Sequence, residues 1–285
     1  MNSRRDTVVP SPQGGGLGWG KRAWQIVMHV ESVGSGAPLL LIHGWGMHGG
    51  VWNDVAQKLS ANFRVLSVDL PGYGFSKTEM EVVEKRASAM DTIVGELSAC
   101  ITESITVCGW SLGGQIAMRW ATQEPHKVKR LILIASTPCF VELENWPFGM
   151  KKNILEKFAS ELEQNLVTTL RRFITLQLRG SENEKELLLM LRESIFSRGE
   201  PDISALRDGL NILRDLDLRD ELEDITQPTL VIAGERDKLT TPQASHYLAQ
   251  AIPSANLVEI KGAAHAPFMS HPDEFVKHVK RFLHE

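Results

Sequence analysis

The chain has few cysteines, no excess of positive charge and no long hydrophobic run. Its 285 residues include 31 Lys and Arg against 35 Asp and Glu, a formal net charge of −4, so the basic excess of a broad nucleic-acid-binding face is missing. The longest apolar runs, at 38–42 and 131–135, are far shorter than the roughly 20 residues of a membrane span. The first residues also lack the apolar core of a signal peptide. We therefore expect neither a nucleic acid nor a membrane as a partner.

The three cysteines are Cys100, Cys108 and Cys139. An odd number, with two of them in or near apolar runs, is typical of reduced, buried thiols and not of a disulfide framework. We therefore expect a cytoplasmic protein. Hydrophobic residues at 42% and charged residues at 23% are ordinary values for a globular chain, so the composition does not indicate disorder.

Short apolar runs alternate with helical patterns from residue 24 onward, which predicts an α/β fold with a doubly wound sheet. Several runs are almost continuously hydrophobic, as in strands that are covered on both faces of a mostly parallel sheet. The predicted strands are 25–31, 38–42, 64–68, 105–108, 131–135, 229–233 and 256–260. The predicted helices between them lie around 51–59, 112–122, 242–251 and 272–283.

Two segments depart from this alternation. Residues 1–20 contain three successive glycines and two prolines, and we expect them to be a flexible tail outside the fold. From 140 to 224 the pattern is helical, without a convincing strand. This insertion is predicted to form a helical cap over the carboxyl edge of the sheet, where open α/β sheets bind ligands. The α/β core would then comprise 21–139 and 225–285.

Residues 109–113 read Gly-Trp-Ser-Leu-Gly and stand between a predicted strand and a predicted helix. A turn this tight strains the serine backbone and leaves no room for side chains two positions away on either side, which explains the glycines. It also projects the Ser111 hydroxyl beside the amino end of a helix, whose free N–H groups and dipole suit an oxyanion. Ser111 is therefore the predicted nucleophile. The alternative is a serine that only caps a helix.

Residues 43–46 read His-Gly-Trp-Gly and follow another predicted strand. An acyl-transfer intermediate needs two convergent donors, and the backbone N–H of Trp45 could pair with that of Leu112 to hold the oxyanion. The Trp45 indole would also form an apolar wall for an acyl chain, although plain packing is an alternative for this ring. His43 sits at a strand end among glycines. We therefore expect it to be a buried residue that braces the loop, and not a catalytic base.

A triad on this fold follows the chain order Ser, acid, His. Asp237 comes just after the predicted strand 229–233 and would orient an imidazole and stabilise its cation. Glu235 competes for this role, and position alone does not decide between the two acids. His265 follows the last predicted strand among small neighbours, so we expect it to be the base. The alternative is that His265 is an ordinary histidine in a surface loop.

Three further runs are Ala-Ser-Thr-Pro-Cys-Phe at 135–140, Arg-Phe-Ile-Thr-Leu-Gln at 172–177 and Ala-Ala-His-Ala-Pro-Phe at 263–268. The Ser-Thr-Pro-Cys-Phe run and the tryptophan before Ser111 are more discriminating than the glycine-flanked serine turn itself. Together with 43–46 and 109–114, the three runs resemble the α/β-hydrolase superfamily. Within it they resemble the esterases that demethylate pimeloyl-[acyl-carrier protein] methyl ester in biotin biosynthesis. The resemblance extends from Trp24 to the C-terminus. It implies that Ser111, Asp237 and His265 form the triad, and that Trp45 and Leu112 help to bind the ester carbonyl.

The resemblance also makes two predictions for the cap. The first is an acyl channel lined by Phe173, Ile174, Thr175, Leu176 and Gln177. The second is a patch that receives the acidic carrier protein, made of Arg171, Arg172, Arg179 and Lys185. The three arginines lie in a stretch, 165–181, that has no Asp or Glu. The wider cap is not basic, so a solvated amphipathic helix is an alternative interpretation of this patch.

The predicted reaction is a two-step acyl transfer. His265 takes the proton of Ser111, the serine attacks the methyl ester, methanol leaves, and water hydrolyses the acyl-enzyme. No metal or organic cofactor is expected, and the enzyme is expected to be a monomer. A general carboxylesterase or a C–C bond hydrolase would use the same triad under a different cap. A haloalkane dehalogenase is disfavoured because its chemistry needs a carboxylate in place of Ser111. A ligand receptor without catalysis is the alternative from a different class.

Overall fold

The computed structural model describes residues 5–10, 26–78 and 88–284 of the chain. Its strands are β1 (Arg5–Pro10), β2 (Ile26–Val33), β3 (Ala37–Ile42), β4 (Phe63–Val68), β5 (Lys77–Thr78), β6 (Ile105–Trp110), β7 (Val128–Ile134), β8 (Thr229–Gly234) and β9 (Ala255–Ile260). They form one sheet in the order β1-β2-β4-β3-β6-β7-β8-β9, with β5 paired to β2.

The sheet is parallel from β4 through β3 and β6 to β9, and antiparallel where β2 meets β1, β4 and β5. Every residue of β6 and β8 is buried, because helices cover both faces of these strands. Each strand predicted from the hydrophobic runs is present, with ends shifted by up to three residues. The prediction of a mostly parallel, doubly wound α/β sheet is confirmed.

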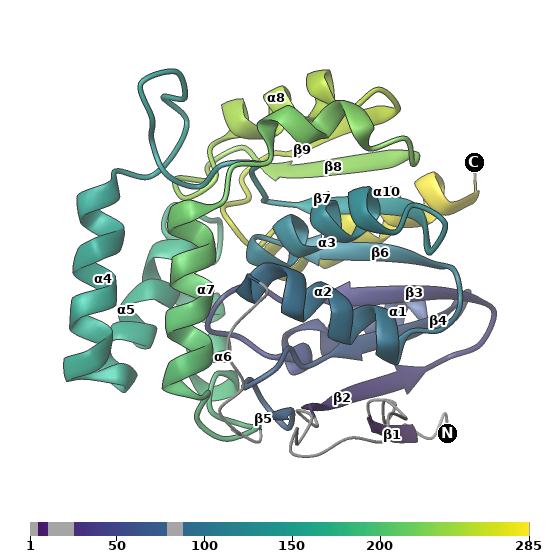
Figure 1. Ribbon diagram of the computed structural model, residues 1–285, viewed down its shortest axis with the longest axis horizontal. Coiled ribbons are helices and arrows are strands. Elements are labelled where there is room, and N and C mark those ends of the chain that lie inside the picture. Colours follow the sequence, from purple (N-terminus) through teal and green to yellow (C-terminus); the bar gives the residue numbers. More distant parts are fainter. Residues whose placement is uncertain (1–4, 11–25, 79–87, 285) are drawn as a thin grey trace, which may run out of the picture.

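Helices cover both faces of the sheet. In Figure 1, α2 and α3 lie in front of it, whereas α1 and α10 pack against each other on the opposite face. The helical segments that pack around the sheet are η1 (Gly49–Trp52), α1 (Asn53–Leu59), α2 (Ala89–Cys100), α3 (Leu112–Gln123), η2 (Arg219–Asp224), α8 (Pro242–Ala251), α9 (Pro267–Ser270) and α10 (Pro272–His284).

Helix α2 is absent from the sequence prediction, although its start carries a recognisable signal. Ser88 caps this helix by accepting a hydrogen bond from the backbone N–H of Asp91. The side chains of Met90, Val94 and Leu97 are buried at intervals of three and four residues. This is the apolar stripe of an amphipathic helix, which was not predicted from the sequence.

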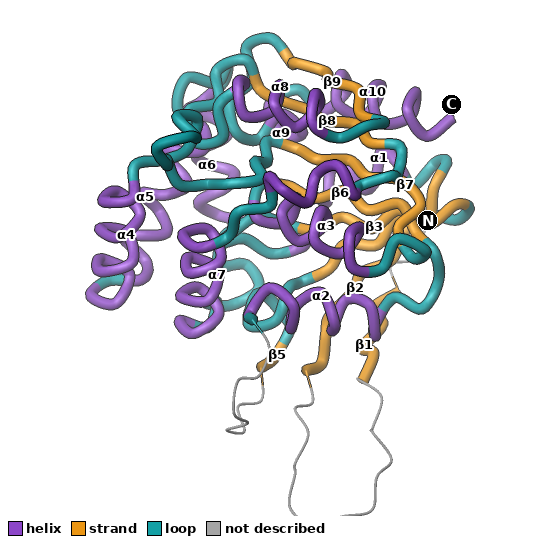
Figure 2. Tube along the Cα trace, turned by 45° about the horizontal axis from the view of Figure 1, so that its top comes forward, coloured by secondary structure: helices purple, strands orange, loops and turns teal. Residues whose placement is uncertain are grey.

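Four further helices lie beyond the carboxyl ends of the parallel strands (Figures 1 and 2). They are α4 (Lys152–Gln164), α5 (Leu166–Leu178), α6 (Glu184–Ser194) and α7 (Ile203–Asp215). All four fall within 140–224, the segment for which the sequence predicts a helical cap; the division into core and cap at those residues stays a prediction. In the described part of the chain, no helix is both long and apolar enough to cross a membrane.

The N-terminal segment differs in part from the predicted tail. Arg5–Pro10 is strand β1, and it pairs antiparallel with β2 at the edge of the sheet. The expectation that residues 1–20 lie outside the fold is therefore wrong for these six residues. Thr7, Val8 and Val9 are β-branched and favour an extended backbone, which the prediction did not weigh against the neighbouring glycines. The rest of the predicted tail lies outside the described residues.

The chain reverses its winding direction between β3 and β6, which are neighbours in the sheet. From β3 it proceeds to β4 on one side, and from β6 it proceeds through β7 and β8 to β9 on the other. Open α/β sheets bind ligands at such a reversal, outside the carboxyl ends of the two strands. The loops after β3 and β6 hold residues 43–46 and Ser111, so the fold brings these two motifs together.

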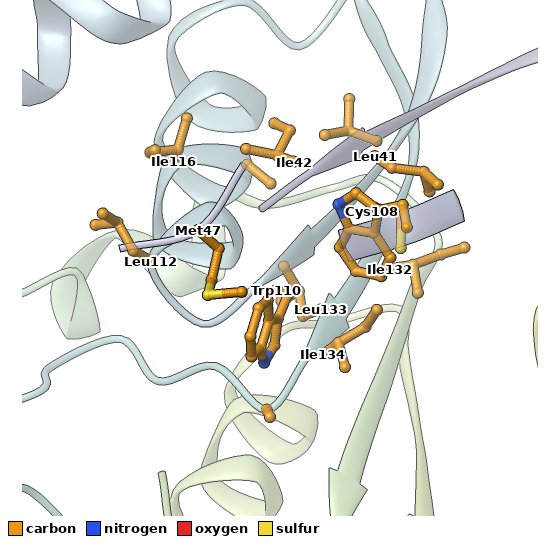
Figure 3. Close-up of a cluster of buried hydrophobic side chains, with 14 of the residues drawn as sticks. Leu41, Ile42, Met47, Cys108, Trp110, Leu112, Ile116, Ile132, Leu133 and Ile134 are labelled. Carbon is orange, nitrogen blue, oxygen red and sulfur yellow. The ribbon is translucent and has the colours of Figure 1, made fainter. Parts of the chain in front are cut away.

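Large apolar side chains fill the core beneath this point. Figure 3 shows Trp110 of β6 among Met47, Leu112 and Ile134, which come from the loop after β3, the start of α3 and the end of β7. Each of these four side chains is at most 1% exposed. Full burial of an apolar side chain is worth roughly 1.5–3 kcal/mol, so this packing holds the ends of the central strands in place.

Candidate active site

Ser111 occupies a strained turn between β6 and α3. Its φ of 55° and ψ of −116° lie outside the regions that side-chain-bearing residues ordinarily adopt. A Cβ atom at Gly109 would lie 2.2 Å from the carbonyl oxygen of Gly113, and one at Gly113 would lie 2.4 Å from the carbonyl oxygen of Ile42. Only glycine fits at these two positions. The glycines therefore permit the tight turn that the sequence predicts around Ser111.

Hydrogen bonds to residues outside α3 help to hold the strained turn. The backbone N–H of Ser111 donates to the carbonyl of Ile134 at 2.9 Å, and the Ser136 hydroxyl donates to the carbonyl of Ser111 at 2.9 Å. A backbone in such a region costs of order 1–3 kcal/mol and persists only where its surroundings determine it. Ser111 itself is 7% exposed.

His43 is buried at the end of β3 and uses both ring nitrogens. Its Nδ1 donates to the carbonyl of Gly44 at 2.8 Å, and its Nε2 accepts from the backbone N–H of Leu70 at 3.0 Å. Burial lowers the pKa of His43 to about 4, so the ring is neutral at physiological pH. His43 therefore braces the loop, as expected, and has no free nitrogen with which to act as a base.

The loop of Trp45 runs directly beside the serine, because a Cβ atom at Gly44 would lie 3.3 Å from the Cβ of Ser111. Leu112 is the first residue of α3, so its N–H has no acceptor within the helix. The Trp45 indole is 1% exposed, and its N–H donates to the carbonyl of Leu206 in α7 at 2.8 Å. Trp45 thus also joins the loop after β3 to α7. The pairing of the Trp45 and Leu112 N–H groups around an oxyanion stays a prediction.

Asp237 and His265 are brought together from the loops after β8 and β9. The Nδ1 of His265 donates to Oδ2 of Asp237 at 2.8 Å, and both side chains are almost completely buried. Glu235 is directed elsewhere: its carboxylate accepts from the backbone N–H of Gly262 at 2.8 Å. The sequence left open whether Asp237 or Glu235 orients the imidazole. In the structure, Asp237 makes the hydrogen bond to the ring.

Three further contacts fix His265 beside the serine turn. Its carbonyl accepts from the indole N–H of Trp110 at 2.7 Å, and its backbone N–H donates to the carbonyl of Gln177 in α5 at 3.1 Å. The Trp110 and His265 rings are 5.7 Å apart. His265 Nε2 is buried and has no hydrogen-bond partner among the described residues. The nitrogen that a general base needs therefore has no other partner among these residues, and its ring lies against Trp110, the residue that precedes the predicted nucleophile.

The predicted channel residues of α5 lie at different depths. Phe173 is 4% exposed and packs edge-on against Trp45, with ring centroids 4.7 Å apart. Gln177 is 1% exposed, and its Oε1 has no partner in the described part of the chain. Ile174 is buried, whereas Thr175 and Leu176 are half-buried. Phe173 thus contacts Trp45, and the backbone carbonyl of Gln177 contacts His265. That the five residues line an acyl channel stays a prediction.

The predicted carrier-protein patch is exposed but only partly free. Arg171, Arg179 and Lys185 are exposed, and no ion pair is formed by them within the described residues. Arg172, by contrast, pairs with Glu161 at 2.5 Å and lies over the ring of Phe158. Three of the four predicted cations are thus available to an acidic partner.

A buried ion-pair network between the α6–α7 connection and the sheet was not predicted from the sequence. Nη1 of Arg198, in the connection from α6 to α7, lies 3.2 Å from each carboxylate oxygen of Asp69, and its Nη2 lies 2.7 Å from Glu31. The Arg198 and Asp69 side chains are 6% and 0% exposed. They are 129 positions apart, so no local pattern could have linked them. Thr240, which contacts Asp237, was also missed; a hydroxyl three residues after the acid was the available signal.

Comparisons with known proteins agree with this geometry. A model of the α/β-hydrolase fold family matches residues 37–272. A pimeloyl-[acyl-carrier protein] methyl ester esterase from Nitrosomonas europaea is 42% identical over 249 residues, 87% of this chain and 96% of that protein. The protein of the same name from Nitrosospira multiformis is 38% identical over 259 residues, 90% of this chain and 98% of that protein. The solved structure of an esterase from Exiguobacterium antarcticum has a TM-score of 0.82 at 22% identity, covering 92% of this chain and 97% of that one, a likeness of fold.

Proposed function

Because the chain belongs to the α/β-hydrolase fold family and, within it, to the pimeloyl-[acyl-carrier protein] methyl ester esterases, we propose that it hydrolyses the methyl ester of pimeloyl-acyl-carrier protein. The products are methanol and pimeloyl-acyl-carrier protein, and the step belongs to biotin biosynthesis. The observation that carries the proposal is the hydrogen-bonded pair of Asp237 and His265, which leaves Nε2 of His265 without a partner among the described residues.

The proposed reaction begins when Nε2 of His265 takes the proton of the Ser111 hydroxyl and Oγ attacks the ester carbonyl. Asp237 stabilises the imidazolium that forms. Backbone N–H groups of Trp45 and Leu112 hold the oxyanion, for which a helix start provides a favourable dipole. His265 returns the proton to the departing methoxide. Water then enters and attacks the acyl-enzyme as His265 removes its proton. His265 returns that proton to Oγ of Ser111, which leaves, and the free acid is released.

The cap supplies the substrate selectivity in this proposal. Phe173 and Trp45 form an apolar wall for the methylene chain of the acyl group, and Gln177 lies where the chain approaches His265. The carrier protein binds the exposed cations Arg171, Arg179 and Lys185. We further propose that the enzyme acts as a monomer in the cytoplasm. Its three free cysteines support a reducing compartment.

Hydrolysis of pimeloyl-carrier-protein methyl ester should be compared with that of the free methyl ester. We expect a large preference in kcat/KM for the carried substrate, and the Arg171→Glu, Arg179→Glu double variant should lose much of it while hydrolysing the free ester normally. Lys277→Glu, which reverses an exposed charge on α10, is the matched control. Equal rates on the two substrates would reject the carrier protein as a partner and leave a general carboxylesterase.

Ser111→Ala separates an enzyme from a ligand receptor. The variant should fold as the unaltered protein does and lose activity on every ester, including a short-chain p-nitrophenyl ester. A serine-reactive phosphonate should label the unaltered protein and not the variant. Retained turnover in Ser111→Ala would refute the proposed nucleophile.

A further inference from the structure

Thr240 lies against the same carboxylate oxygen that serves His265. It is 2% exposed, and it stands between β8 and α8, three residues after Asp237. Its hydroxyl donates to Oδ2 of Asp237 at 2.8 Å and lies 3.3 Å from Nδ1 of His265. The imidazole Nδ1–H also donates to Oδ2, at 2.8 Å. Two hydrogens, one from each side chain, therefore converge on one oxygen.

The other oxygen of Asp237 is also fully used. Oδ1 accepts from the backbone N–H of Leu239 at 2.8 Å and from that of Thr240 at 3.1 Å. A carboxylate offers about four lone-pair sites, so these donors occupy all of them. Three of the four bonds hold the carboxylate to its own loop, and the fourth is the one that orients the imidazole.

We propose that Thr240 is a positioning residue for the base: its hydroxyl holds Oδ2 of Asp237 in line with Nδ1 of His265 and moderates the negative charge that this oxygen presents to the ring. The inference rests on the proposed function, because it assigns a task to a residue behind the proposed triad. Thr240 is not a catalytic residue, since it acts through Asp237 and does not touch the reacting atoms.

The electrostatic surroundings of His265 make this effect measurable. Asp237 is the charged group hydrogen-bonded to the ring. The residues that reach His265 from other elements are neutral, Trp110 from β6 and Gln177 from α5. Glu235 and Arg236 of the same loop bond to the backbone of Gly262 and Gly180 instead. Each hydrogen bond to an ionised carboxylate disperses its charge, so loss of the Thr240 hydroxyl leaves a more negative Oδ2 and favours the protonated imidazole.

Thr240→Val tests this directly, because it keeps the side-chain shape and removes the hydroxyl. The pH midpoint of the His265 ring titration, followed by NMR without substrate, should rise by about 0.5 unit. The acid side of the kcat/KM profile on a p-nitrophenyl ester should move in the same direction. At neutral pH kcat should fall roughly tenfold, and KM should change little. This decrease in kcat is much smaller than the one expected from removing His265. The far-downfield proton signal of the Asp237–His265 hydrogen bond should shift.

Three variants make the outcome unambiguous. Thr240→Ser keeps the hydroxyl and should restore the midpoint, the proton signal and kcat. Thr240→Ala provides a second hydroxyl-free side chain if the valine variant folds poorly. Thr229→Val removes another buried hydroxyl, which donates to a backbone carbonyl at the far end of β8, and should leave all three readouts unchanged.

Unchanged titration and proton signal in both hydroxyl-free variants would overturn the proposal, as would an equal shift in Thr229→Val. These spectroscopic readouts need no substrate. If the protein failed to hydrolyse the carrier-bound ester, the proposed function would fall while the shift in Thr240→Val would still be measured. A failure of the Thr240 proposal would likewise leave the esterase assays intact.

Discussion

Two buried aspartates follow parallel strands of the same sheet, and the cationic or titratable side chain beside each of them differs. Asp69, after β4, accepts from the backbone N–H groups of Gly49 at 2.6 Å and Phe75 at 2.8 Å, and from Arg198. Asp237, after β8, accepts from two backbone N–H groups, one hydroxyl and His265. Both carboxylates have their lone pairs occupied. The cation beside Asp69 is permanent, whereas the ring beside Asp237 can take and release a proton.

This difference separates a structural carboxylate from one that can serve catalysis. A guanidinium does not deprotonate in proteins, so the pair of Asp69 and Arg198 can only hold segments together. It joins the loops after β3 and β4 to the connection between α6 and α7. An imidazole changes its charge near neutral pH, and Asp237 leaves one of its nitrogens free. The same carboxylate chemistry thus holds the connection between α6 and α7 at Asp69 and, in the proposed mechanism, supports the base at Asp237.

Asp237→Asn should have the largest effect on activity. An amide cannot accept from Nδ1–H in the same way and favours the wrong tautomer of His265, so kcat should fall by about 10⁴-fold. The free energy of unfolding, measured with urea, should change far less than kcat implies. Glu235→Gln is the control and should remain active. If Asp237→Asn kept a tenth of the activity, Asp237 would not be the acid of the triad.

Arg198→Met should have the largest effect on stability. It leaves Asp69 buried without its cation, so the free energy of unfolding should fall by about 3–5 kcal/mol. Arg236→Met removes an arginine whose contacts with Glu182 and Glu235 are exposed, and it should cost at most about 1 kcal/mol. Equal losses in urea unfolding would show that burial of the Arg198 pair is not what makes it important.

The Asp69 region should nevertheless respond to pH, through His43 beside it. Burial lowers the pKa of His43 from 6.5 to about 4 in the folded state. Between these values the unfolded chain binds a proton that the folded chain does not, so stability is full above pH 6.5 and falls as the pH drops towards 4. The expected loss in urea unfolding is about 2 kcal/mol between pH 7 and pH 5. A His43→Gln variant should lose stability less steeply over this range, and an unchanged slope would contradict the assignment to His43.

The smallest effect is expected for Glu31→Gln. Glu31 is the second carboxylate beside Arg198, its side chain is 15% exposed, and a glutamine oxygen can still accept from Nη2. The free energy of unfolding should fall by about 1 kcal/mol or less. A loss as large as that of Arg198→Met would identify Glu31, and not Asp69, as the main partner of the arginine.

Much of the fold could be predicted because its signals are local. The apolar runs of the central strands are continuous, since both faces of those strands are buried. The strand–turn–helix around Ser111 is set by glycines within four residues of each other, where a Cβ atom would collide with the backbone. Helix α2 was not predicted, although its apolar stripe is present in the sequence. Strand β1 was missed because it needs β2 as a partner, a non-local condition.

The sequence by itself determined the parallel sheet, the serine turn and the order of Ser111, Asp237 and His265 along the chain, because each depends on steric and hydrophobic patterns within a few residues. Only the tertiary structure decided that Asp237 and not Glu235 bonds to the imidazole, that Thr240 shares the same oxygen, and that Arg198 reaches Asp69. Those outcomes depend on the direction of side chains from distant segments. The direction in which a loop residue points its side chain cannot be predicted from the hydrophobic pattern along the chain.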